Sequence, residues 1–301
     1  MASKELDAVL GLLRKHPFRL DAGEEELRRA LDQLGKAFSP PEGVKRDTVK
    51  LGGMMAERLA AGVGPSVLFL HGGGYVVGSP QSHRHLAGLL AKELGGTVWV
   101  LDYRRAPECP FPAALDDALA AYRDLVAQRS SPAPGPAPGP ARGPAIVGDS
   151  AGGGLTFALA LRLRDESLPA PAALVGISPW VNLGTESESY DFYKNVDPLL
   201  SRDIAGYFAK RYLAGKPADE PLASPLFANL AGLPPTLIQV GDRECFLGDA
   251  VRMHQRLIAS GVDSELSVWK EMFHVWHLYW PMLPDGKRAI GEIAQFLAAK
   301  S

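Results

Sequence analysis

The sequence has little of three things: cysteine, long apolar runs and excess charge of one sign. Two cysteines in 301 residues do not make the disulfide framework of a small secreted protein, and they favour a reducing compartment. No apolar run is long enough to span a bilayer, and the first residues lack the apolar region of a signal peptide. A net charge of −2 gives no basic surface for nucleic acid or anionic membranes. We therefore expect a cytoplasmic protein without an integral membrane segment.

The sequence is rich instead in glycine and proline, with 32 and 25 residues that punctuate its apolar runs. The runs predict strands at 44–51, 54–59, 66–70, 97–101, 145–147, 173–177, 236–240 and 265–269. Amphipathic or helix-forming stretches predict helices at 3–15, 23–38, 82–94, 113–128, 155–161, 246–260 and 287–298. From residue 66 onward strands and helices alternate, which predicts a mainly parallel sheet with helices on both faces. Catalytic groups of such α/β folds lie in loops at the carboxyl ends of the strands.

Two stretches interrupt this alternation. Residues 130–144 are so rich in proline and glycine that they predict an extended surface loop, although a domain linker has the same composition. Residues 180–234 lack a strand pattern and carry many aromatic side chains, which predicts an inserted helical cap that packs with the N-terminal helices over the active site. The expected division is N-terminal cap helices (1–40), a first core segment (41–184), inserted cap helices (185–230) and a second core segment (231–301).

A short motif follows the predicted strand 145–147 directly. Residues 148–152 read Gly-Asp-Ser-Ala-Gly, a G-x-S-x-G sequence between a buried strand and a helix-forming segment. This context favours a nucleophile elbow over an ordinary turn, because Ser150 must adopt strained backbone angles and its neighbours at −2 and +2 must be small. The following helix points its positive end at the serine, where an oxyanion would form.

A second glycine-rich stretch, His71-Gly-Gly-Gly74, follows the predicted strand 66–70. Consecutive glycines after a strand expose backbone N–H groups, the donors that hold the negative oxygen of a tetrahedral acyl intermediate. We predict an oxyanion hole from the amides of Gly72, Gly73 and Ala151. A phosphate-binding loop is the alternative, but the lysine and the glycine spacing of such loops are missing. The ring of His71 is expected to fix the loop.

A serine nucleophile needs a general base, and the chain order in this fold is serine, acid, histidine. Only His274 and His277 lie after the elbow in a loop that follows a predicted strand. A metal pair at i, i+3 is an alternative that no further ligand completes, and His274 is chosen because it lies nearer the strand end. The acid is expected in the loop 241–249, where Asp242 and Glu244 both qualify by position.

With these residues in view, the chain resembles the bacterial hormone-sensitive-lipase-like esterases, family IV of the α/β hydrolases, from about residue 66 onward. The resemblance rests on HGGGY (71–75), DYRRAPE (102–108), PFPAALDDA (110–118), GDSAGGG (148–154), SPW (178–180), SPL (224–226), GLPP (232–235) and FHVWH (273–277). It implies an α/β-hydrolase fold with a helical cap, and an acid about thirty positions before the histidine in a D-x-L-x-D-[DE] motif. The matching segment starts at Glu244, so the resemblance favours Glu244, with Asp242 as the second candidate.

The implied activity is that of a serine carboxylesterase that hydrolyses short- to medium-chain esters through an acyl-enzyme, without metal or organic cofactor. Two alternatives stay open. The same triad could hydrolyse amides, as in arylacetamide-deacetylase-like relatives, or the fold could serve a non-catalytic ligand receptor that has lost the histidine. The presence of His274 argues against the receptor. The expected partner is a small-molecule ester, and a homodimer through an edge strand or terminal helix is left open.

Overall fold

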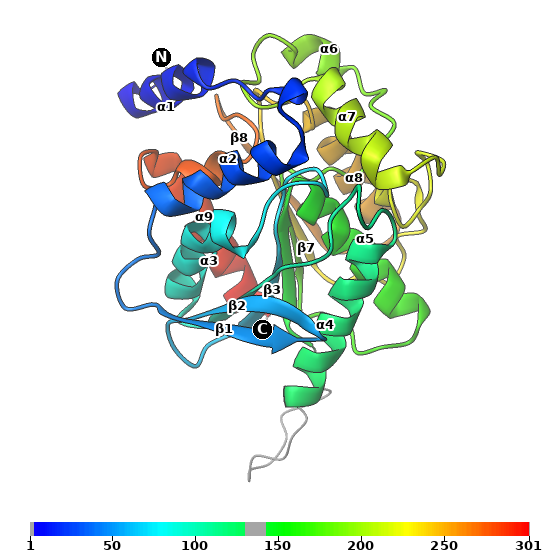
Figure 1. Cartoon of the computed structure of the whole chain (residues 1–301). Coiled ribbons are helices and arrows are strands. Elements are labelled where there is room, and N and C mark those ends of the chain that lie inside the picture. Colours follow the sequence, from blue (N-terminus) through cyan, green and yellow to red (C-terminus); the bar gives the residue numbers. More distant parts are fainter. Residues whose placement is uncertain (1–2, 130–142, 301) are drawn as a thin grey trace.

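The computed structural model describes residues 3–129 and 143–300, so most of the loop predicted at 130–144 lies outside the described residues. Within these ranges, eight strands form one sheet in the order β1-β2-β4-β3-β5-β6-β7-β8 (Figure 1). The strands β1 (Lys45–Leu51) and β2 (Met54–Ala60) form an antiparallel hairpin, and β2 pairs antiparallel with β4 (Thr97–Leu101). All other neighbours pair in parallel, which confirms the predicted mostly parallel sheet.

The remaining elements follow the predicted alternation. The strands are β3 (Ser66–Leu70), β5 (Ala145–Asp149), β6 (Leu174–Ile177), β7 (Thr236–Gly241) and β8 (Ser264–Trp269). The longer core helices are α3 (Pro80–Leu94), α4 (Ala113–Arg129), α5 (Ala151–Asp165), α8 (Leu247–Ala259) and α9 (Pro284–Lys300). The predicted start of α3 at residue 82 is wrong, because Ser79 caps the helix in a reciprocal capping box with Ser82 and Pro80 occupies the first turn. Likewise α9 begins at a proline, three residues before the predicted start.

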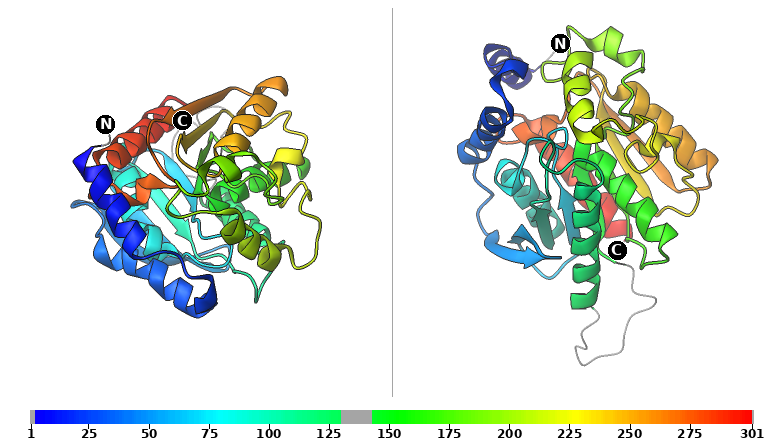
Figure 2. Two further views of the ribbon diagram at one scale, coloured as in Figure 1. Left: turned by 90° about the horizontal axis from the view of Figure 1, so that it is seen from above. Right: turned by 45° about the vertical axis from the view of Figure 1, so that its right-hand side comes forward.

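Strand β3 illustrates why the middle of the sheet is buried on both faces. Val67 and Phe69 belong to one buried cluster, which includes residues of α1, α3 and α9, whereas Leu68 and Leu70 belong to a second cluster with α4, α5 and α8. This alternation is the two-residue period of a strand covered by helices on both sides. Figure 2 shows the two helical layers on opposite sides of the sheet.

Helices outside the sheet layers lie beyond the carboxyl ends of the parallel strands, above the sheet in Figure 1. They are α1 (Lys4–Lys15) and α2 (Glu24–Ala37) from the N-terminus, and α6 (Ser189–Tyr193) and α7 (Arg202–Leu213) from the insertion. The insertion is less helical than predicted, because α6 has only five residues and loops make up much of the rest. The two groups touch: the rings of Phe18 and Phe208 meet edge to face at 5.5 Å, and Arg211 of α7 pairs with Glu24 of α2 at 2.5 Å.

None of the helices described between residues 3 and 300 combines the length and apolar character needed to cross a membrane. The parallel strands β3, β5, β6, β7 and β8 run in the same direction, so the loops that follow them meet at one edge of the sheet. That edge carries every residue that the sequence analysis predicts to be catalytic.

Candidate active site

Ser150 occupies a sharp turn between the end of β5 and the first residue of α5. Its φ of 52° and ψ of −118° are strained for a residue with a side chain. The small neighbours are required: a Cβ on Gly148 would lie 2.2 Å from the carbonyl oxygen of Gly152, and one on Gly152 would lie 1.9 Å from the carbonyl oxygen of Leu70. The strained turn predicted from the motif is therefore present.

His274 lies in the loop after β8, and its imidazole reaches the serine. Its Nε2 atom is 3.0 Å from Ser150 Oγ, and the ring packs edge to face on Phe246, with 4.9 Å between the ring centroids. His277 has another partner, since its Nε2 is 2.8 Å from Gln239 Oε1. Burial lowers the pKa of His277 to about 3, so it is neutral. The two histidines do not form the metal pair considered from their spacing.

Glu244, and not Asp242, faces the imidazole. The Glu244 carboxylate is fully buried, with Oε1 at 3.5 Å from His274 Nδ1, a long contact at the outer limit of hydrogen bonding. Asp242 instead accepts a hydrogen bond of 2.6 Å from the amide of Glu271 and lies 3.7 Å from Arg243, where it braces the turn. Of the two carboxylates that position alone leaves open, Glu244 is the one that lies beside His274.

Ser178, the first residue of the Ser-Pro-Trp motif at 178–180, has contacts that its sequence context does not reveal. The Ser178 hydroxyl donates to Glu244 Oε2 at 2.8 Å and accepts from the amide of Val275 at 3.2 Å. The Gly241 amide also donates to Glu244 Oε2, at 3.0 Å. Two donors thereby fix one carboxylate oxygen and leave the other directed at His274.

Asp197, from the segment between α6 and α7, is a second residue that sequence reasoning missed. Its carboxylate accepts hydrogen bonds from the amides of Cys245 (3.0 Å), Leu199 (3.0 Å) and Leu200 (3.1 Å). Burial raises the pKa of Asp197 to about 6, with the attraction of His274 opposing the rise. It lies in a segment without a periodic pattern, so no sequence signal marks it.

The glycine loop after β3 corrects one prediction. The Gly72 amide donates to Asp149 Oδ1 at 2.9 Å, so the prediction that Gly72 supplies an oxyanion donor is wrong. The physical reason is that the buried Asp149 carboxylate already accepts the hydrogen bond of this amide. The amides of Gly73, Gly74 and Ala151 donate to no acceptor in the part of the chain that the structure describes.

His71 serves the loop as predicted. Its Nδ1 atom lies 2.8 Å from the Gly72 carbonyl oxygen, and its ring stacks on Tyr103 at a centroid distance of 4.2 Å. The Tyr103 hydroxyl in turn donates to the His71 carbonyl oxygen at 2.7 Å. Burial holds the pKa of His71 well below its ordinary value, so its ring is neutral and structural.

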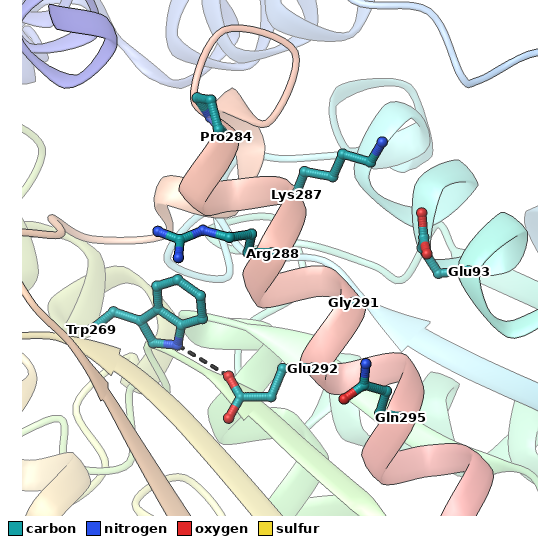
Figure 3. Close-up of a pocket in the computed structure, with 8 residues that line it drawn as sticks. All are labelled: Glu93, Trp269, Pro284, Lys287, Arg288, Gly291, Glu292 and Gln295. Atoms are coloured by element: carbon teal, nitrogen blue, oxygen red, sulfur yellow. Dashed lines mark hydrogen bonds between the residues drawn. The ribbon is translucent and has the colours of Figure 1, made fainter. Parts of the chain in front are cut away.

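A hollow elsewhere on the molecule, between β8 and α9, lacks such chemistry (Figure 3). Its lining consists of Glu93, Trp269, Pro284, Lys287, Arg288, Gly291, Glu292 and Gln295. Glu292 accepts a hydrogen bond from the Trp269 indole at 3.2 Å, and Arg288 lies over the same ring. The hollow contains no serine, histidine or cysteine, and it does not include Ser150, Glu244 or His274.

Comparison with known proteins places this geometry in context. The family described as alpha/beta hydrolase fold matches residues 67–278. An acetyl-hydrolase of Streptomyces hygroscopicus is 45% identical over 300 residues, which cover 99% of this chain and 97% of the relative. An esterase of Acinetobacter venetianus is 33% identical, over 96% of this chain and 94% of the relative.

The chain is also similar to solved structures of esterases. A crystal structure of an esterase from the bacterial hormone-sensitive lipase family is 39% identical, with a TM-score of 0.93 over 100% of this chain and 99% of that one. A structure of the esterase EstE5, soaked with p-nitrophenyl butyrate, is 38% identical with a TM-score of 0.91, over 99% of both chains. The chain therefore belongs to the α/β-hydrolase fold family, among the esterases related to bacterial hormone-sensitive lipase.

Proposed function

We propose that this chain is a serine carboxylesterase that hydrolyses esters of short to medium acyl chains through an acyl-enzyme. The observation that carries the proposal is the 3.0 Å separation between Ser150 Oγ and His274 Nε2 at the end of a strained turn. A serine hydroxyl is barely ionised at neutral pH, so it becomes nucleophilic only when a base takes its proton. The similarity to an acetyl-hydrolase and an esterase supports ester hydrolysis.

In the first step, Ser150 Oγ attacks the ester carbonyl carbon while His274 Nε2 takes the hydroxyl proton. The tetrahedral intermediate collapses, the carbon–oxygen bond to the alcohol breaks, and His274 returns the proton to the departing oxygen. Water then attacks the acyl-enzyme by the same route, which releases the carboxylic acid product and regenerates the Ser150 hydroxyl. Throughout, Glu244 holds the Nδ1–H tautomer and stabilises the imidazolium.

The intermediate's negative oxygen needs donors, and we assign them to the amides of Gly73, Gly74 and Ala151. The amide of Gly72 is excluded because Asp149 accepts its hydrogen. Ala151 is the first residue of α5, so the positive end of that helix adds to the stabilisation. Removing one such donor typically lowers kcat by a factor of about 10²–10³.

The expected limit on acyl length rests on the cap. We call residues 71–74, the glycine loop after β3, the oxyanion loop. A Cβ on Gly74 would lie 2.3 Å from Phe208 Cγ, so the ring of this α7 residue packs directly on the oxyanion loop. Phe18 packs against the same ring. Two aromatic rings over the loop leave little room for a long chain, which favours short to medium acyl groups.

The compartment is proposed from the thiols. Cys109 and Cys245 are both free, and Cys245 is buried. Unpaired cysteines are typical of a reducing compartment, so we propose the cytoplasm. We also propose that the N-terminal helices and the 185–230 insertion act together as the cap.

The test is turnover of p-nitrophenyl acetate, butyrate, octanoate and palmitate by the wild type, Ser150→Ala and the control Ser66→Ala. Ser150→Ala should abolish turnover and labelling by a fluorophosphonate while the protein remains folded. Ser66, a partly buried strand residue, should be replaceable without loss of kcat. Wild-type turnover or labelling in Ser150→Ala would overturn the assignment, and a maximum at palmitate would overturn the proposed chain length.

A further inference from the structure

Asp149 directly precedes the nucleophile, and the steps proposed above do not use it. Its carboxylate is buried, and each oxygen has one partner. Oδ1 accepts the Gly72 amide at 2.9 Å, and Oδ2 lies 3.2 Å from His83 Nε2. His83, on α3, is also buried, with 1% of its surface exposed. Two titratable groups thus lie behind the oxyanion loop, shielded from water.

His83 contacts Asp149 through Nε2. A carboxylate oxygen can only accept, so the Nε2–H of His83 is the donor to Asp149 Oδ2. On the other side of the ring, His83 Nδ1 lies 2.8 Å from the Ser82 hydroxyl, which is also 2.9 Å from the Ser79 carbonyl oxygen. The histidine thus gives the second carboxylate oxygen a hydrogen-bond donor.

This donor matters because an unpaired carboxylate here would oppose the developing negative charge of the oxyanion. The hydrogen bond from His83 offsets part of that charge, while Asp149 remains a strong acceptor for the Gly72 amide. The loop is also held at its start, where Tyr103 donates to the His71 carbonyl oxygen at 2.7 Å. Gly73 and Gly74 follow these two anchors, so their amides depend on both for direction.

We propose that Asp149 is a positioning residue of the oxyanion hole, which binds the first glycine amide so that the next two stay free, with His83 donating a hydrogen bond to its other oxygen. The inference rests on the proposed function, since it assigns a task within acyl transfer at Ser150. The interaction with the oxyanion exists only in the transition state, so its loss lowers kcat and leaves KM nearly unchanged.

The central experiment compares Asp149→Asn with Asp149→Leu. An asparagine can accept from the Gly72 amide with its oxygen and donate to His83 Nε2 with its nitrogen when His83 is in the Nδ1–H tautomer. We expect less than about a tenfold loss of kcat for Asp149→Asn and about a 10²–10³-fold loss for Asp149→Leu, with KM within about threefold of wild type in both. Affinity for a trifluoromethyl ketone should fall in parallel with kcat.

The matched control is Asp124→Leu. Asp124, on α4, also accepts a glycine amide, that of Gly52 in the β1–β2 hairpin, at 2.8 Å. Its other hydrogen-bond partner is Gln128, so neither partner belongs to the elbow or the oxyanion loop. This variant should lose stability and keep kcat, which separates the positional effect from general damage to the fold.

A second pair of variants tests the role of His83. His83→Leu removes the hydrogen-bond donor to Oδ2 and leaves a buried carboxylate with one partner behind the oxyanion loop, so kcat should fall at least tenfold. Adding Asp149→Asn removes that charge, so the double variant should be more active than His83→Leu alone. This pair decides the question by itself if Asp149→Leu does not fold.

Three results would overturn the inference: near wild-type kcat in folded Asp149→Leu, a loss in Asp149→Asn as large as in Asp149→Leu, or no gain from Asp149→Asn in the His83→Leu background. Fluorophosphonate labelling of Ser150 distinguishes this failure from failure of the proposed function. An unlabelled, inactive wild type defeats the esterase mechanism. A labelled, active wild type with any of the three results defeats only the role of Asp149.

Discussion

His274 and Glu244 meet through a single carboxylate oxygen, with 3.5 Å between Nδ1 and Oε1. The other oxygen, Oε2, accepts from Ser178 at 2.8 Å and from the Gly241 amide at 3.0 Å. Since both of these donors are fixed in orientation by their own surroundings, Glu244 cannot rotate its carboxylate without losing them. The Glu244 carboxylate is therefore held by Ser178 and Gly241 more firmly than by His274.

This asymmetry predicts a large effect of Glu244→Gln. The two donors to Oε2 require the amide oxygen of glutamine at that position, which turns the NH₂ group toward His274 Nδ1. Two donors then face each other, and the imidazole adopts the tautomer that cannot accept the serine proton. We expect kcat on p-nitrophenyl acetate to fall about 10³–10⁴-fold, as for the Asp→Asn change in a serine protease triad.

Asp242→Asn is the matched control on the same loop. Its oxygen can still accept the Glu271 amide, which Asp242 now binds at 2.6 Å, so kcat should stay within about threefold of wild type. Equal losses in the two variants would contradict the assignment of Glu244 as the acid.

Ser178→Ala is expected to affect both catalysis and stability. The hydroxyl hydrogen-bonds both Glu244, in the loop after β7, and the amide of Val275, in the loop after β8. Its removal leaves the buried Val275 amide without its acceptor. An unsatisfied buried group costs about 1–3 kcal/mol in the free energy of unfolding, and a looser Glu244 should lower kcat about tenfold. Urea unfolding and steady-state kinetics measure the two effects.

Ser264→Ala provides the comparison for Ser178→Ala. Its hydroxyl lies 2.9 Å from His254 Nδ1 on a partly buried strand, away from the site, so kcat should not change. A wild-type kcat and unfolding free energy in Ser178→Ala would show that the bridge is without consequence.

The sheet and the elbow could be predicted because their signals are local. A buried strand such as β3 is a short apolar run, and the turn at Ser150 needs Gly148 and Gly152, which the sequence displays directly. The start of α3 could have been predicted as well, since Ser79 and Pro80 are an N-cap and a first-turn proline in sequence.

The parts of the site that were missed depend on contacts between distant segments. Ser178 is 66 residues from Glu244, and Asp197 is 48 residues from Cys245, so no spacing rule connects them. The error at Gly72 has the same origin. Which glycine amides remain free depends on the direction of the Asp149 carboxylate, 77 residues away, and a sequence pattern does not contain that direction. Position alone also left Asp242 and Glu244 equivalent.

Gly152→Ala should be among the most damaging single substitutions. The added Cβ would lie 1.9 Å from the Leu70 carbonyl oxygen and 2.6 Å from that of His71, both backbone atoms of β3 and the oxyanion loop. Backbone cannot move aside cheaply, so we expect insoluble protein or a loss of at least about 3 kcal/mol in the free energy of unfolding.

Gly291→Ala, in α9, is expected to raise the free energy of unfolding, in contrast to Gly152→Ala. Nothing lies within 4 Å of the position of its Cβ, and alanine favours the helix, so stability should rise by about 0.5–1 kcal/mol. Urea unfolding of both variants checks the contrast. Wild-type stability in Gly152→Ala would contradict the tight approach of α5 to β3.

The raised pKa of Asp197 predicts that the free energy of unfolding falls as pH rises. Its pKa is raised to about 6 by burial, with Glu244 adding to the rise and His274 opposing it, whereas the unfolded chain has a pKa of about 3.9. Between these values the folded protein binds a proton that the unfolded chain does not, so the free energy of unfolding decreases with pH across pH 4–6. The shift corresponds to roughly 2–3 kcal/mol. Asp197→Asn removes the titration, so its unfolding free energy relative to wild type should rise by about that amount between pH 4 and pH 7.

Asp191→Asn is the control for this titration, because Asp191 is an exposed residue of α6 paired with Arg202. Its stability relative to wild type should be the same at both pH values, as measured by urea midpoints in matched buffers. A constant difference between Asp197→Asn and wild type across pH 4–7 would mean that folding does not raise the pKa of Asp197. The buried carboxylate would then hold its charge through the amides of Cys245, Leu199 and Leu200, which donate to it at 3.0–3.1 Å.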